Sequence, residues 1–260
     1  MTLWEALILG VVQGATEFLP VSSSGHLVIA QALLDVRIPG VVFEVVVHVA
    51  TLVSILWVYR ERVTDLIRGV ISLEVSALGY AALLVLATIP AALLGLFFQD
   101  SIEGLFDSAV VPGVALLVTG VVLWTARWAV ERAERPRPDS GSALAIGFAQ
   151  ACALVPGISR SGSTVVAALW LRVDPEEAAA FSFLMAVPAI AGAAVLQLPE
   201  MGAVEGPGLG VLLVGGVAAA ITGGLAIRTF VAMLARRSFH YFAPYCWVVG
   251  AAYLAWVLNA

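Results

Sequence analysis

The chain has 260 residues, of which 61% are hydrophobic and only 12% charged, and its mean hydropathy is +1.01. A soluble domain carries about 25% charged residues, so this composition excludes a soluble fold. The formal net charge is −5 and the basic residues, all Arg, are scattered, which argues against binding to nucleic acid. Long apolar runs without strand alternation predict an all-α polytopic membrane protein made of a single domain, 1–260.

Six apolar stretches are long enough to cross a bilayer as helices, which takes about 20 residues. In chain order these predicted spans are 41–59, 77–98, 109–130, 180–198, 209–232 and 241–258.

Four shorter apolar limbs lie outside the predicted spans. They form two pairs, 3–16 with 21–34 and 142–155 with 162–171. Each limb reaches only about 15–21 Å as a helix, so each pair is predicted to be a re-entrant hairpin. Because irregular backbone at membrane depth needs protein or a wet cavity around it, both hairpins are expected to form a site.

The charges of the intervening segments predict the orientation in the membrane. Three expected loops, 60–75, 131–141 and 233–240, each contain two or three Arg residues, whereas the expected loops 99–108 and 199–207 carry acids and no Arg. By the positive-inside rule, the Arg-rich face is cytoplasmic. The first hairpin then opens to the outside and the second to the cytoplasm.

The two hairpins resemble each other in sequence. Residues 8–30 align with residues 145–168 at Gly10/Gly147, Gln13/Gln150, Pro20/Pro156, Ser22/Ser159, Ser24/Ser161, Gly25/Gly162 and Val28/Val165. Three predicted spans separate them. Because this number is odd, the two halves, about 1–135 and 142–260, are expected to form an inverted-topology repeat. Such repeats place their site where the broken helices meet.

The first hairpin carries an acid, a hydroxyl run and an imidazole at its break. Glu17 is either a general base or metal ligand, or an acid that caps a helix end. Ser22, Ser23 and Ser24 follow Pro20 where a helix would begin, and a helix N-terminus binds anions. His26 lies three residues after Ser23, a spacing that suits a nucleophile and its base, although a structural histidine is the alternative.

The second hairpin carries one cation, Arg160, between Ser159 and Ser161. A guanidinium binds phosphate through two N–H groups, and the serine hydroxyls add further hydrogen-bond donors. The alternative is an Arg whose side chain extends to the membrane interface. In the first predicted span, Glu44 and His48 share a helix face. They are either partners for a metal ion or a polar pair whose side chains hydrogen-bond to each other. Ser182 is a weaker candidate.

The stretches QGATEFLPVSSSGH and PGISRSGST resemble the two signature motifs of the undecaprenyl-diphosphate phosphatase family, membrane enzymes linked to bacitracin resistance. The length and the segment FSFLMAVPAI extend the resemblance over the whole chain. It implies an enzyme that removes one phosphate from a C55 isoprenoid diphosphate at the outer face of the plasma membrane. This reaction recycles the lipid carrier of cell-wall synthesis.

The resemblance also implies roles for the residues of the motifs. Glu17 would be a base or a metal ligand, Ser23 the nucleophile, and His26 its base or itself the nucleophile. Arg160 would bind phosphate, and the candidate substrate-binding residues are Ser22, Ser24, Ser159, Ser161, Thr164 and Gln13. The family uses a divalent cation, Mg²⁺ or Ca²⁺. Some members carry an acid where this chain has Gln13, so a second carboxylate would have to come from Glu44.

Two other classes of protein compete with the phosphatase. Inverted repeats with broken helices are typical of secondary transporters, so a polyprenyl-phosphate flippase is the alternative function. A pure carrier has no use for a Ser, His and Glu cluster, and a structural scaffold leaves Glu17, His26 and Arg160 unexplained. The expected partners are the C55 lipid and the bilayer, and a homodimer is an open alternative.

Overall fold

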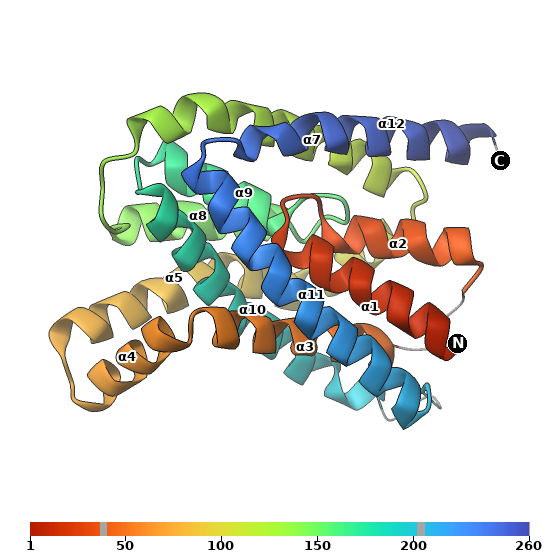
Figure 1. The fold of residues 1–260 in the computed structure, drawn as a ribbon, viewed down its shortest axis with the longest axis horizontal. Helices are drawn as coiled ribbons and strands as arrows, with labels where there is room; N and C mark the ends of the chain where they lie inside the picture. The colour runs from red at the N-terminus through yellow and green to blue at the C-terminus, as the bar shows by residue number, and fades with distance from the viewer. Residues whose placement is uncertain (37–40, 202–205, 260) are drawn as a thin grey trace.

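The computed structural model describes residues 1–36, 41–201 and 206–259, and within these ranges the chain is helical, without a β-strand (Figure 1). The helices are α1 (Leu3–Phe18), α2 (Ser23–Leu34), α3 (Val42–Val58), α4 (Arg60–Ile71), α5 (Val75–Phe97), α6 (Gln99–Phe106), α7 (Val111–Ala129), α8 (Ser140–Cys152), α9 (Arg160–Trp170), α10 (Pro175–Met201), α11 (Leu209–Ala235) and α12 (Phe242–Asn259). Two short 3₁₀ turns, η1 (Val130–Arg132) and η2 (Phe239–Tyr241), extend α7 and precede α12.

The six predicted spans all fall on helices, namely α3, α5, α7, α10, α11 and α12. Five of these helices, with their 3₁₀ extensions, are long and apolar enough to cross a membrane. The sixth, α3, qualifies only together with α4, from which it is bent by 84°. The described ranges therefore hold five or six candidate spans, which confirms an all-helical, multi-pass membrane protein.

Two segments expected to be loops are helical, and those expectations were wrong. The segment 60–75 contains α4, and the segment 99–108 contains α6. In α4 the apolar residues recur at helical spacing between charged ones, as in a helix that lies at an interface. Figure 1 shows α4 beside α5, projecting from one end of the molecule. The expected loop 199–207 falls partly on 202–205, outside the described residues.

Each predicted hairpin is a pair of short helices joined by a turn. In the first pair α1 packs against α2, and in the second α8 packs against α9. Helix α1 ends at Phe18 because Leu19 precedes a proline and takes an extended conformation. Helix α8 begins after Asp139, which accepts a 2.7 Å hydrogen bond from the Ser142 amide. That bond holds the pKa of the Asp139 carboxyl below its usual value.

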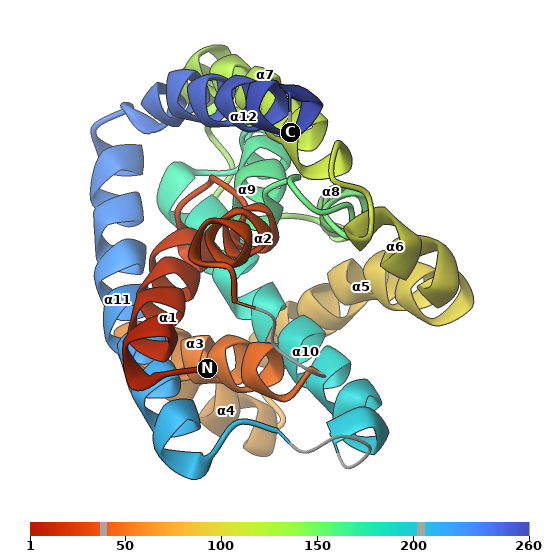
Figure 2. The ribbon, with the colours of Figure 1, turned by 90° about the vertical axis from the view of Figure 1, so that its right-hand side faces the viewer.

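The first helix of each pair packs on a long helix of the other half of the chain. Helix α1 runs alongside α11 in both views, and α8 lies against α5 (Figures 1 and 2). Gly10 of α1 faces the backbone of Gly215, and the aligned Gly147 of α8 faces the backbone of Ala87. A Cβ at either glycine would overlap the facing carbonyl, so these contacts depend on glycine.

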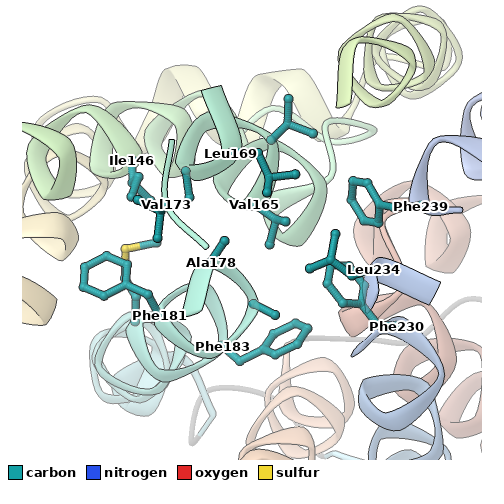
Figure 3. Close-up of a cluster of buried hydrophobic side chains, with 14 of the residues drawn as sticks. Ile146, Val165, Leu169, Val173, Ala178, Phe181, Phe183, Phe230, Leu234 and Phe239 are labelled. Carbon is teal, nitrogen blue, oxygen red and sulfur yellow. The ribbon is translucent and has the colours of Figure 1, made fainter. Parts of the chain in front are cut away.

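A hydrophobic core beneath α9 holds the hairpins in place (Figure 3). Phe183 of α10 lies 5.1 Å, centroid to centroid, from Phe230 of α11 and 5.5 Å from Phe18. Both pairs meet edge to face, a geometry that adds about 0.5–1.5 kcal/mol beyond the buried area. Since Phe18 directly follows Glu17, this aromatic packing fixes the end of α1 that carries the acid.

Candidate active site

The two hairpins meet at the carboxylate of Glu17, in the last turn of α1. Glu17 is 8% exposed and both of its oxygens are bound. Oε1 accepts from Nη2 of Arg160 at 2.5 Å, and Oε2 accepts from Oγ of Ser23 at 2.6 Å. Oε2 also accepts from Nε2 of Gln13, one turn earlier in α1, at 2.9 Å. The structure thus brings together four residues that the sequence singles out, three from the first hairpin and Arg160 from the second.

Arg160 completes this cluster from the start of α9, directly after its N-cap Ser159. Its side chain is 16% exposed. While Nη2 is bound to Glu17, Nη1 is buried and has no hydrogen-bond partner among the described residues. A buried guanidinium N–H without a partner is costly, and a phosphate oxygen is the acceptor that suits it. The geometry therefore leaves Nη1 of Arg160 as a donor that a bound anion would satisfy.

Ser23 is the first residue of α2 and is partly buried. Its hydroxyl donates to Glu17, and no hydrogen bond joins it to His26 within the described chain. A serine whose hydroxyl donates to a buried carboxylate can pass its proton to that carboxylate when it attacks an electrophile. Both Ser23 and Arg160 stand at helix N-termini, whose positive dipole ends favour a bound phosphate.

His26 lies one turn further along α2 and has different partners. Its Nδ1 is 2.9 Å from the carbonyl oxygen of Ser22, and its Nε2 is 2.8 Å from the hydroxyl of Tyr245 in α12. Because a carbonyl only accepts, Nδ1 carries the proton and Nε2 of the neutral ring is the acceptor. Sequence reasoning missed Tyr245, since a tyrosine in an apolar span gives no local signal of such a contact.

The hydroxyls of Ser22 and Ser24 hold the turn between α1 and α2. Ser22 caps α2 by accepting from the amide of Gly25, and it accepts from the amide of Gly157 in the other hairpin at 3.2 Å. Its φ of 68° is rare for a residue with a side chain, and such strain gathers at functional sites. Ser24 lies 3.2 Å from Ser22, Oγ to Oγ, and is less buried.

In the second hairpin, three of the predicted substrate-binding residues are almost completely buried and bonded internally. Ser159 caps α9, and Ser161 donates to the carbonyl of Leu19 at 3.4 Å. Thr164 donates to the carbonyl of Arg160 and lies 2.6 Å from Ser182, Oγ1 to Oγ. These contacts fix the start of α9, which carries Arg160, and join it to the turn of the first hairpin.

The structure separates Glu44 from Glu17 and brings His48 close instead. The carboxylate of Glu44 accepts from Nε2 of Gln31 at 3.0 Å. Nδ1 of His48 lies 2.7 Å from the carbonyl of Glu44, and Nε2 of His48 lies 3.8 Å from Oε2 of Glu17. His48 therefore borders the candidate site, a position that its helix face alone does not reveal.

The oxygen ligands around Glu17 suit a divalent cation only if a bound phosphate supplies further ligands to it. No cluster of three His, Cys, Asp or Glu ligands occurs in the described ranges. Oε1 of Gln13, however, is a buried acceptor without a partner in the same ranges, beside the carboxylate of Glu17. Mg²⁺ is commonly held by one or two carboxylates together with substrate phosphates, and Glu17 with Gln13 suits that arrangement.

Comparison with known proteins gives matches along nearly the whole chain. A family model described as bacitracin resistance protein BacA matches residues 6–252. A relative from Desulfatibacillum aliphaticivorans, named undecaprenyl-diphosphatase, is 40% identical over 267 residues, which cover 96% of this chain and 97% of the relative. A relative of the same name from Salinibacter ruber is 42% identical over 279 residues, covering 99% of this chain and 100% of the relative.

Proposed function

Since the chain belongs to the bacitracin resistance protein BacA family, we propose that it hydrolyses undecaprenyl diphosphate to undecaprenyl phosphate and inorganic phosphate. The relatives named undecaprenyl-diphosphatase support the substrate and the reaction. The single observation that carries the proposal is the buried carboxylate of Glu17, which binds the hydroxyl of Ser23 and the guanidinium of Arg160 at once. This arrangement places a nucleophile, a base and a phosphate-binding cation in one site.

In the first step, Oγ of Ser23 attacks the terminal phosphorus while its proton passes to Glu17. A P–O bond to Ser23 forms and the anhydride P–O bond breaks, so undecaprenyl phosphate leaves as an anion and needs no proton. Nη1 of Arg160 and the N-terminal amides of α2 and α9 stabilise the charge on the phosphoryl oxygens in the transition state.

In the second step, a water molecule attacks phospho-Ser23 and His26 accepts its proton. The tautomer set by the carbonyl of Ser22 leaves Nε2 of His26 as the acceptor for this proton. The P–O bond to Ser23 breaks, Glu17 returns the proton to Ser23, inorganic phosphate leaves, and His26 releases the proton of the water to solvent.

The proposal includes a divalent cation, Mg²⁺ or Ca²⁺. Glu17 and the unpartnered oxygen of Gln13 would hold the cation, which supplies positive charge for the phosphoryl oxygens. Glu44 takes no part in this arrangement, because its carboxylate is bound to Gln31.

We also propose that the chain crosses the plasma membrane six times and holds two re-entrant hairpins, with the site open to the outside. The halves 1–135 and 142–260 would be inverted repeats within one domain. Three features support the repeat: the aligned motifs, the matched Ser22 and Ser159 caps, and the exchanged packing of α1 on α11 and α8 on α5. The homodimer stays a prediction.

The flippase alternative is not favoured. A carrier needs the anion site of Arg160 but has no use for the Ser23 and Glu17 pair, and the relatives are named as phosphatases.

The experiment that tests the function is phosphate release from undecaprenyl diphosphate by the purified chain in detergent, with Mg²⁺ or Ca²⁺ and then with EDTA. We expect cation-dependent release that Arg160→Ala and His26→Ala each reduce to a low residual rate. Arg172→Ala is the matched control, because Arg172 is an exposed arginine paired with Glu134. Detergent removes the bilayer, so no release from folded wild type with either cation would favour the flippase.

A further inference from the structure

The last helix of the chain contacts the turn of the first hairpin through two consecutive residues. The hydroxyl of Tyr245 lies 2.8 Å from Nε2 of His26, and the thiol of Cys246 lies 3.8 Å from the carbonyl oxygen of Pro20. Helix α12 itself packs on α7, so it holds this position through contacts away from the site. The contact joins residues 219 positions apart in the chain.

The two rings are held in a defined orientation. The planes of His26 and Tyr245 differ by 9°, with centroids 5.7 Å apart. Nδ1 of His26 is held by the carbonyl oxygen of Ser22, so the ring is fixed at both nitrogens. Because Nδ1 carries a proton, the hydroxyl of Tyr245 is the donor to Nε2 while the ring is neutral.

The hydroxyl of Tyr245 can also form a hydrogen bond with the protonated ring of His26. When Nε2 gains a proton it becomes a donor, and the tyrosine oxygen, which has lone pairs, accepts from it after its own hydrogen rotates away. A single hydroxyl therefore holds the imidazole in both protonation states, which the flat ring of a phenylalanine cannot do.

We propose that Tyr245 links His26 to the attacking water: its hydroxyl occupies the lone pair of Nε2, so it passes its own proton to Nε2 as it takes the proton of the water. This inference rests on the proposed function. Tyr245 touches neither the phosphate-binding Arg160 nor Ser23 in the described contacts, so it acts on the second step of the reaction alone.

The kinetic test uses Tyr245→Phe, which keeps the ring and removes the hydroxyl. If hydrolysis of phospho-Ser23 becomes limiting, kcat falls about tenfold and KM falls with it, so kcat/KM is retained. Tyr253→Phe is the matched control, because Tyr253 is a buried tyrosine two turns further along α12 and packs on Trp256.

In the His26→Ala background, Tyr245→Phe is expected to have no further effect on the residual rate. A fall in kcat/KM equal to the fall in kcat, an unchanged kcat, or the same loss without His26 would overturn the proposal.

A second test needs no turnover. Diethyl pyrocarbonate acylates the free nitrogen of an imidazole, and mass spectrometry resolves the three histidines of the chain. Tyr245→Phe is expected to speed acylation of His26 and to leave His48 and His240 unchanged. An unchanged rate at His26 would show that Tyr245 does not hold it. If the wild type released no phosphate, the proposed function would fail, and the acylation rates would still decide whether Tyr245 occupies Nε2 of His26.

Discussion

At the scale of single residues, the site depends on one carboxylate with three donors. Glu17 and Arg160 are a nearly buried ion pair, and such pairs hold their geometry only while both partners remain. The same carboxylate receives the hydroxyl of Ser23, so one side chain orients the cation and accepts the proton.

We expect Glu17→Gln to lower kcat by about 10²- to 10⁴-fold, the usual contribution of a general base. The amide keeps the shape of the side chain but does not accept the proton of Ser23. Glu5→Gln is the control, because Glu5 is a partly exposed acid in the first turn of the same helix, away from the site. Steady-state phosphate release measures both, and a Glu17→Gln enzyme within a few-fold of wild type would contradict the assignment.

Much of the site could be predicted from the sequence, and there is a physical reason why the rest could not. Glu17, Ser23, His26 and Arg160 stand at breaks in apolar segments, where a polar side chain is costly and therefore informative. The matched family confirms the resemblance that their motifs carry. Tyr245 reaches the site by a long-range contact that nothing in its local sequence indicates. The helix face that singles out Glu44 and His48 does not show that His48 is the one near Glu17.

At the scale of elements, the close approach of helices explains where the glycines lie. Gly10 and Gly147, aligned in the two hairpins, each meet the backbone of a helix from the other half. The membrane spans could be predicted because the hydropathy of the sequence shows how long and how apolar each segment is. Helices α4 and α6 could not, because their mixed composition is also that of a loop.

Gly10→Ala and Gly147→Ala are each expected to destabilise the protein by about 1–3 kcal/mol, since a methyl group would push apart helices that touch through backbone. Gly95→Ala, with nothing within 4 Å of its Cβ in α5, is expected to be neutral or slightly stabilising. Thermal unfolding in detergent checks all three. Equal stability of the Gly10 and Gly95 variants would mean that α1 and α11 do not pack this closely.

At the scale of the whole molecule, the account requires that the two halves insert in opposite directions. The Arg-rich segments 60–75, 131–141 and 233–240 then lie on one side and the acidic segment 99–108 on the other. With this topology, the N-termini of α2 and α9 would reach one carboxylate from opposite faces of the membrane.

Single cysteines at positions 102 and 137, in a chain whose Cys152 and Cys246 are replaced by Ala, test this topology. Position 102 is expected to react with an impermeant maleimide added outside intact cells, and position 137 only after the cells are opened. Reaction of both from the same side would contradict six spans.

The most direct measurement of the central claim, that Ser23 attacks phosphorus with Glu17 as its base, is the search for a phosphoenzyme. His26→Ala is expected to accumulate it, because the water attack is impaired while the first step remains. After incubation with substrate carrying a labelled terminal phosphate and a quench in neutral SDS, which preserves both phosphoserine and phosphohistidine, the account predicts labelled phosphate on the peptide that contains Ser23. The label should be absent from Ser23→Ala/His26→Ala and present in Ser24→Ala/His26→Ala. Full turnover by Ser23→Ala, or an alkali-stable label on His26 in the wild type, would contradict it.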